Sequence, residues 1–512
     1  MISENRIILA SEYETVVPFA DAAVPRHLLI SGDSGSGKTA TLQNLIESFS
    51  ALGLPVFCND VSGDLGGLCQ AGSGDASALP EALRDAYRTR AYPVRFWSSG
   101  KDAGIPLRVR VGDMGPEILA AMLSLTPAQT NLLATVFRIS DEAGLELCDF
   151  KDLRAMLKYV NDNRKEYAEQ YGTITPTTVG AVQRALQAVE SAASDIFGEP
   201  ALDAEDLLGF SDDGRGVVSL LNAANLAQNP RIYQAVVLWI LTSVCEQIAA
   251  AAEDSSLSAV FCFDNADALF EGISKDTADK VARVLDILTG KGIGVVFAAR
   301  CTSSVPAVIL AKIGNRIQHR KAVNTPEDKK DIKASAAVIA LGSAADTERT
   351  ISVLENGDAI FSLLADDGFT RETVVAHTLP SESKAGAVKS SVIESIVATD
   401  EMTGKYQETV DRETAYEKIS EAEAALAKAE AKANGTGAAV LNAAKKTGKS
   451  AVSSAVSSVS NSVSTNIVNS ITGGKKKSAK EIAAKAAKSA LSSTMRNGIN
   501  SILRGLFGTK KK

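Results

Sequence analysis

The chain alternates short apolar runs with longer amphipathic stretches. Apolar runs typical of buried strands lie at 26–32, 54–60, 214–223, 258–264 and 292–300. Several of the stretches between them carry apolar residues at helical spacing behind an N-cap residue. Strands that alternate with helices predict a doubly wound α/β fold with a mostly parallel sheet. Shorter alternating patterns predict further strands at 92–99, 105–111, 316–323 and 358–364.

The pattern changes at about residue 113, where helical periodicity replaces the strand-like runs. We therefore expect a helical insertion at 113–205, between two parts of the α/β core at 1–112 and 206–378. Residues 379–433 are predicted to form a linker and a helix. Residues 434–512 are rich in Ser, Ala and Lys and form a separate basic tail.

The clearest chemical motif lies between the first buried run and the helix predicted at 39–53. Its sequence, GDSGSGKT, matches the P-loop pattern GxxxxGK[ST]. Glycines let backbone N–H groups turn inward around phosphate oxygens, Lys38 supplies a charge at the β- and γ-phosphates, and the Thr39 hydroxyl can ligate Mg²⁺. We therefore expect ATP and Mg²⁺ to bind here. The expected nucleotide-binding residues are Gly32, Asp33, Ser34, Gly35, Ser36, Gly37, Lys38, Thr39 and Ala40.

A second candidate residue ends the apolar run AVFCFD. P-loop enzymes hold the Mg²⁺ shell with a carboxylate at the end of a buried strand, and Asp264 fits this position. The alternative is an ordinary Asp at a strand end. The next residue, Asn265, stands where an acid would polarise the attacking water, and an amide cannot act as a base. Asp267 is expected to point elsewhere on the following turn.

Two further carboxylates, Asp60 and Asp64, follow the strand predicted at 54–60. In a parallel sheet the carboxyl ends of the strands face one crevice, so either acid can contact the nucleotide or metal-bound water. Asp and Gly also favour turns, and the sequence does not decide between these two readings.

An arginine can stabilise the γ-phosphate of a neighbouring subunit as an arginine finger. Arg316 is the candidate, with Arg300 and Arg320 as alternatives, and each can equally be a structural or solvated residue. His319 is expected to be a strand-face residue rather than a catalyst.

Charge is distributed unevenly along the 512 residues. Residues 434–512 hold 12 Lys, 2 Arg and one acid, a net charge of +13. Because the whole chain carries −7, the other residues carry −20.

The six cysteines lack CxxC spacing, which suits free thiols in a reducing cytosol. We find no secretory signal, no apolar run near the ~18 residues of a membrane span, and only three unclustered His, so a cytoplasmic protein without a zinc site is expected.

The tail carries a narrow Val/Ile stripe at 451–471 and lysine clusters at 475–477 and 510–512. Small residues beside a narrow stripe favour packing against another helix, in self-association or partner docking. Two alternatives are a disordered basic tail and a segment that lies on an anionic membrane surface.

Several segments together resemble a known family. They are the P-loop, VFCNDVSGDLGGL at 56–68, FGEP at 197–200, the strand that ends at Asp264, GNRIQH at 314–319 and GKYQETVDRETAYE at 404–417. The chain resembles the bacterial helicase HerA-like family, a branch of the HerA/FtsK P-loop ATPases. The resemblance implies a RecA-like core, ATP with Mg²⁺, and ring-shaped homo-oligomers that act as motors on DNA. The P-loop begins at residue 32, so the N-terminal β-barrel by which HerA docks its nuclease is not expected, and a nuclease partner is not implied.

The chain departs from the family pattern at four places. Asn265 replaces the usual Glu, residues 299–301 replace a Ser-Gln-Asn stretch, Ala322 replaces an arginine and Ser62 replaces a lysine. All four lie on the catalytic side and none in the phosphate cradle. The resemblance therefore implies a HerA-like ATPase with weakened hydrolysis. The alternative is a nucleotide-gated binding or scaffold protein without significant turnover, whose tail docks a partner or a membrane surface.

Overall fold

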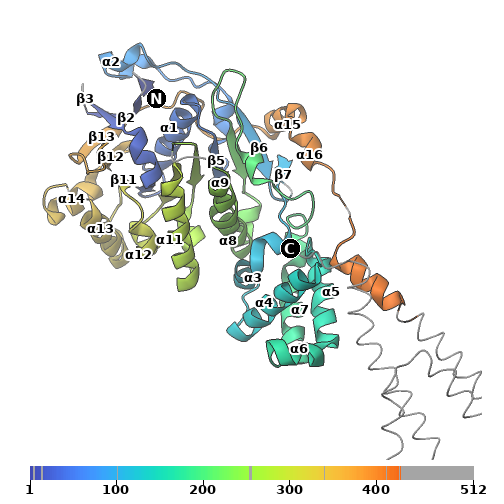
Figure 1. The fold of residues 1–512 in the computed structure, drawn as a ribbon. Helices are drawn as coiled ribbons and strands as arrows, with labels where there is room; N and C mark the ends of the chain where they lie inside the picture. Colours follow the sequence, from blue (N-terminus) through green and yellow to red (C-terminus); the bar gives the residue numbers. More distant parts are fainter. Residues whose placement is uncertain are drawn as a thin grey trace, which may run out of the picture. The chain divides into compact units, whose positions relative to one another are not determined.

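The computed structural model describes residues 1–3, 6–12, 15–100, 102–252, 256–339, 341–410, 412–425 and 427 (Figure 1). These residues form two compact units. The larger comprises residues 1–126 and 185–411, and the smaller comprises 127–184 together with the described residues from 412 onward. Predictions for the tail at 434–512, including the stripe at 451–471, lie outside the described residues.

The larger unit is built on one sheet of 13 strands in the order β1-β2-β13-β12-β11-β4-β10-β9-β5-β8-β6-β7, with β3 paired to β2. From β11 to β7 all neighbouring strands are parallel. In sheet order these strands are β11 (Asn315–His319), β4 (Leu28–Ser31), β10 (Ile293–Ala299), β9 (Ala259–Phe263), β5 (Val56–Asp60), β8 (Val218–Asn222), β6 (Val94–Ser98) and β7 (Ile105–Pro106).

An antiparallel extension continues the sheet beyond β11. Its strands are β12 (Asp358–Ser362), β13 (Val374–Thr378), β2 (Arg6–Glu12), β1 (Ile2–Ser3) and β3 (Thr15–Phe19). Of these, the apolar pattern predicts only β12; β2 and β3 form an antiparallel hairpin, and β13 pairs with both β12 and β2.

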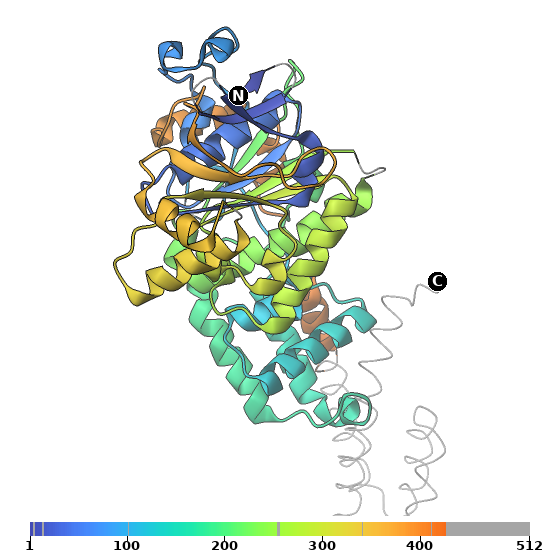
Figure 2. The same cartoon turned by 90° about the vertical axis from the view of Figure 1, so that its left-hand side faces the viewer.

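Helices cover both faces of the parallel strands (Figures 1 and 2). On one face, α1 (Lys38–Ala51) packs its apolar side on residues such as Val56 and Cys58, and α15 (Ser390–Thr399) joins the same core. On the other face, a row of phenylalanines includes Phe57, Phe263 and Phe297, against which Phe270 of α10 (Ala266–Phe270) packs. The doubly wound, mostly parallel sheet predicted from the sequence is therefore confirmed.

Two predicted elements differ in detail. The strand predicted at 105–111 ends at Pro106, because α3 (Val111–Met122) begins soon afterwards and Val109 forms only an isolated bridge with Phe197. The long helix after β8 runs from Pro230 to Ala251 as α8 (Pro230–Trp239), a π-turn (Ile240–Val244) and α9 (Cys245–Ala251). This helix is long and apolar enough to cross a membrane. Most of it is buried inside the larger unit, which is also typical of a central core helix.

The smaller unit is helical. It contains α4 (Pro127–Ala143), α5 (Phe150–Asp162), α6 (Arg164–Tyr171) and the first part of α7 (Pro176–Ala193). Asp152 completes the capping box at the start of α5, and its other oxygen accepts a hydrogen bond from the Thr414 hydroxyl at 2.6 Å. This contact ties the segment after residue 412 to the helices of the insertion.

The other helices of the larger unit are α2 (Glu81–Arg84), α11 (Lys275–Gly290), α12 (Ala307–Leu310), α13 (Pro326–Val338), α14 (Ala344–Val353) and α16 (Thr403–Tyr406). Among them, α11 buries an apolar face that includes Val281, Leu285 and Leu288, and the rest are shorter.

Candidate functional site

The P-loop connects β4 to α1 at the carboxyl edge of the parallel strands. Gly32 and Gly37 have φ angles of +151° and +113°, which side chains with a Cβ rarely adopt. A Cβ on Gly32 would lie 2.7 Å from the Cβ of His319, and one on Gly37 would lie 3.2 Å from the His319 ring. Both glycines are therefore required for the loop to lie against β11.

Within the loop, the carbonyl oxygen of Asp33 accepts hydrogen bonds from Lys38 Nζ and Ser36 Oγ, each at 2.8 Å. Burial lowers the pKa of Lys38, whereas the nearby carboxylates of Asp264 and Asp267 raise it. Lys38 Nζ is thus held by the backbone of the P-loop itself, and its contact with phosphate stays a prediction.

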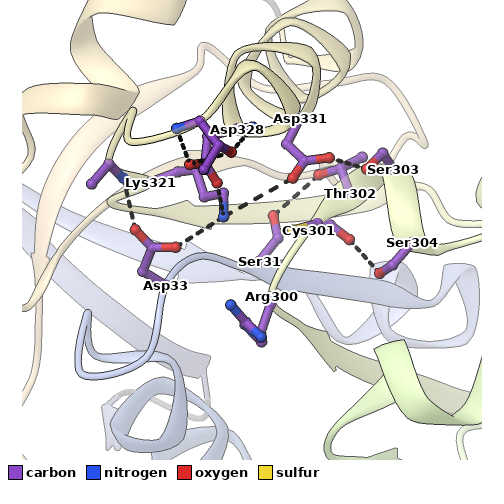
Figure 3. A network of polar contacts seen from close by, with 12 residues as sticks. Ser31, Asp33, Arg300, Cys301, Thr302, Ser303, Ser304, Lys321, Asp328 and Asp331 are labelled. Carbon is purple, nitrogen blue, oxygen red and sulfur yellow. Dashed lines mark hydrogen bonds and ion pairs between the residues drawn. The ribbon is translucent and has the colours of Figure 1, made fainter.

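The carboxylate of Asp33 does not face the loop opening. It accepts hydrogen bonds from Lys321 Nζ at 3.0 Å and from the backbone N–H of Ala322 at 2.7 Å (Figure 3). The Asp33 N–H donates to the Arg320 carbonyl at 2.9 Å. The nucleotide contact expected of Asp33 is not favoured by this arrangement, because both its carboxylate and its backbone N–H are bonded to the segment after β11. Its side chain anchors the P-loop to the segment after β11.

Lys321 joins this anchor to α13. Its side chain is 6% exposed, and its Nζ lies 3.0 Å from Asp328 Oδ1 and 4.0 Å from Asp331 Oδ2, both on α13. Burial lowers the pKa of Lys321, but its bonds to Asp33 and Asp328 outweigh this and raise the pKa above the ordinary value of a lysine. No pattern in the sequence identifies this cluster, because Asp33 and Lys321 lie 288 residues apart.

Asp264 lies at the end of β9, one strand beyond β10 from the P-loop strand. The side-chain amide of Asn59 accepts a hydrogen bond from the Asp264 N–H at 3.0 Å and donates to its carbonyl at 3.1 Å, and Tyr233 OH donates to the same carbonyl at 3.3 Å. One carboxylate oxygen accepts from the N–H of Asn265 at 2.9 Å. Burial raises the pKa of Asp264, and the charge of Lys38 opposes this. The backbone of Asp264 is thus fixed at the edge where Lys38 lies.

These residues fit a magnesium ion held mainly through phosphate and water. Thr39 is half-buried in the first turn of α1, and Asp264 supplies a carboxylate at the end of β9. In the part of the chain that the structure describes, no cluster of three or more His, Cys, Asp or Glu could hold a metal ion alone. An ion that takes its remaining ligands from nucleotide and water needs no such cluster.

Asn265 adopts a left-handed backbone conformation, with φ 57° and ψ 44°, and begins α10. Asn and Asp tolerate this conformation better than other residues that carry a Cβ. The left-handed backbone therefore limits which residue types fit at position 265, in addition to any requirement of the chemistry.

The structure gives different surroundings to Asp60, the last residue of β5, and Asp64, in the turn that follows. Asp60 accepts hydrogen bonds from the N–H groups of Gly63 at 2.7 Å and Leu65 at 3.0 Å, and burial raises its pKa to about 6. This is the turn role that the sequence left open. Asp64 is exposed, and its charge raises the pKa of both Asp60 and Asp264.

The candidate arginines have different surroundings. Arg316 pairs with Leu29 on β4, before the strand reaches the P-loop, and its guanidinium donates to the carbonyls of Ile313 at 2.7 Å and Leu310 at 3.1 Å. Its arginine-finger role stays a prediction that these structural contacts do not favour. Arg300 is exposed and follows β10 directly.

Asp267 and His319 each form hydrogen bonds with segments that border the P-loop. Asp267 accepts hydrogen bonds from the backbone N–H groups of Arg300 at 2.6 Å and Cys301 at 3.3 Å, so its carboxylate is directed to the end of β10. His319 is buried beneath the P-loop, and its Nε2 lies 2.9 Å from the Thr41 hydroxyl. Burial lowers the pKa of His319 to about 4, so the ring is neutral and structural.

One comparison with known proteins identifies the family. The family model described as helicase HerA-like C-terminal matches residues 5–512. No curated protein matches the sequence significantly. Similar solved structures include the bacterial conjugative coupling protein TrwBΔN70, with 14% identity and a TM-score of 0.46 over 74% of this chain and 89% of that one. VirB4 of Thermoanaerobacter pseudethanolicus has 15% identity and a TM-score of 0.48 over 76% of this chain and 98% of that one.

Proposed function

The chain belongs to the helicase HerA-like C-terminal family, and on this basis we propose that it is a cytoplasmic ATP-binding motor that hydrolyses ATP slowly and acts on DNA. The observation that supports this proposal is the P-loop, since Gly32 and Gly37 adopt positive φ angles and Lys38 Nζ lies against the loop between β4 and α1.

Nucleotide binding would draw on the backbone of residues 34–37 and the N-terminus of α1, since the Asp33 N–H already donates to Arg320. Successive N–H groups there can donate to phosphate oxygens, and the helix dipole favours an anion at this end. Lys38 would exchange its bond to the Asp33 carbonyl for one to a phosphate. When bound, Mg²⁺ would neutralise charge on the β- and γ-phosphates, with Thr39 and Asp264 as its protein-side contacts.

Slow hydrolysis is inferred from the acids that remain beside this site. Asn265 cannot take a proton from water, and a positioned base contributes roughly 10²–10⁴-fold to such a step. Asp60 is engaged with the turn that follows β5, and Asp267 is engaged with the end of β10. The exposed Asp64 is the carboxylate left to polarise water.

A second candidate function is a nucleotide-gated scaffold with negligible turnover, which Asn265 favours. In that case binding of ATP would control docking of a partner or a membrane surface, with the basic tail as the docking segment.

Turnover of ATP with and without DNA separates these functions. The motor requires measurable turnover that DNA stimulates, and Lys38→Ala must abolish both turnover and ATP binding without unfolding the chain. ATP binding without turnover, unchanged by DNA, would leave the scaffold. Equal ATP affinity for the wild type and Lys38→Ala by calorimetry would refute both, because each needs the P-loop to bind phosphate.

A further inference from the structure

Arg300 occupies a position in the sheet that brings it beside the P-loop. It is the first residue after β10, the strand between β4 and β9. Ala299 pairs with Ser31, so Arg300 leaves the sheet at the same level as Gly32. The segments that follow β4 and β10 thus leave the sheet side by side, at the edge that also carries Asp264.

The backbone around Arg300 is fixed from several directions. Asp267 accepts the N–H of Arg300, and also the hydroxyl of Ser304 at 2.5 Å. Thr302 is buried, donates to Ser31 Oγ at 3.3 Å and accepts from Ser335 Oγ of α13 at 2.8 Å. The loop that carries Arg300 is therefore bonded to β4, α10 and α13.

The guanidinium itself is not engaged in this way. The Arg300 side chain is exposed, and within the described residues it forms no hydrogen bond or ion pair, as Figure 3 also shows for its surroundings. The other cation close to the loop differs, since Lys321 is buried between Asp33 and Asp328. Arg300 thus combines a backbone that is held in place with a guanidinium that has no partner among the described residues.

Its charge lies near the phosphate-binding lysine. Arg300 follows Ala299, which pairs with Ser31, and the P-loop that carries Lys38 begins directly after Ser31. Two cations near each other repel, and an anion between them would turn this repulsion into attraction. The triphosphate of ATP carries more negative charge than Mg²⁺ and Lys38 neutralise together, and the excess lies at its γ end.

We propose that Arg300 contacts the γ-phosphate of ATP bound to the same chain and so distinguishes ATP from ADP. This inference rests on the proposed ATP binding and adds a residue to that site. It assigns to the chain's own arginine a task that an arginine finger performs between subunits. Because Asp267 and Thr302 fix the loop, the contact would join the γ-phosphate to β4, α10 and α13.

The test compares two nucleotides on three proteins. Calorimetry with Mg²⁺ measures the Kd of a non-hydrolysable ATP analogue and of ADP for the wild type, Arg300→Ala and Arg283→Ala. Arg283 is an exposed arginine on α11 and controls for the loss of one positive charge. A hydrogen bond to a charged group contributes about 1.5–3 kcal/mol, so Arg300→Ala should raise the Kd of the analogue about 10- to 100-fold and leave that of ADP within about twofold. Arg300→Lys should recover part of the loss, since it keeps the charge without the planar fork.

Three outcomes would overturn the inference. They are equal weakening of both nucleotides, no change in either, and weakened DNA binding with unchanged nucleotide affinity, which would assign Arg300 to DNA. Failure of the wild type to bind either nucleotide would instead overturn the proposed function, so the two failures are distinct. Because the Arg300 side chain is exposed and makes no bond, the variants should fold, and circular dichroism checks this.

Discussion

Residue 265 offers the sharpest test of why hydrolysis should be slow. Its backbone is left-handed, a conformation that costs most L-residues about 1–2 kcal/mol and costs Asn and Asp less. Asn265→Glu therefore adds a base and strain together, whereas Asn265→Asp adds a shorter acid with little strain. The two variants separate the chemical effect of a carboxylate from its structural cost.

We expect both variants to raise ATP turnover. If the missing base is the main defect, Asn265→Glu should gain up to roughly 10²–10⁴-fold, and Asn265→Asp should gain less, because its carboxylate reaches less far. The strain should lower the stability of Asn265→Glu by about 1 kcal/mol, a fall in Tm of no more than about 4 °C. A coupled ATPase assay measures the first effect, and thermal denaturation with and without nucleotide measures the second.

Rapid turnover by the wild type that neither substitution changes would refute this reasoning. Another group would then activate the water, and Asp64→Asn would be the next variant to examine. A gain for Asn265→Asp without one for Asn265→Glu would mean that the left-handed backbone prevents Glu from reaching the water.

Three further predictions concern the supports of the site and its assembly. Asp267→Ala should release the loop after β10 and weaken binding of an ATP analogue more than binding of ADP, as calorimetry can check; equal weakening would mean that Asp267 does not act through Arg300. The pKa of His319 falls from 6.5 to about 4 on folding, so the unfolded chain binds more protons in this range and stability should be lost as pH falls from 6.5 to 4, by up to about 3 kcal/mol. His319→Gln should flatten this part of a urea-denaturation series, and an unchanged slope would contradict it. Light scattering with an ATP analogue should show a homo-oligomer, and a strict monomer would count against the motor.

The parts of the site that the sequence predicts are those coded by consecutive residues. The strand, the glycines, Lys38 and the helix follow one another, so the P-loop conformation follows from its own motif. Asp264 is predictable for a similar reason, because a buried strand ends directly before it. The role of Asp60 was ambiguous, since the residue types that favour turns also occur in metal sites, and only its bonds to Gly63 and Leu65 decide it.

The remainder of the site depends on strand order, which a single sequence does not specify. Lys321 meets Asp33 because β11 lies beside β4, and Arg300 reaches the P-loop because β10 lies on its other side. Each residue is an ordinary cation until these neighbours are known. Arg316 shows the reverse case, because its position two residues before Gln318, which pairs with Ser31, places it away from the loop.

The contact between the P-loop glycines and His319 affects how such motifs are compared among related chains. Gly32 and Gly37 are needed for packing against His319 whether or not a phosphate binds. A descendant of this chain that had lost its nucleotide would still be under selection to keep both glycines. Lys38 and Thr39 make no such close contact with His319. When related chains are compared, the identity of these two residues is therefore a better indicator of a functional nucleotide-binding site than the glycine spacing.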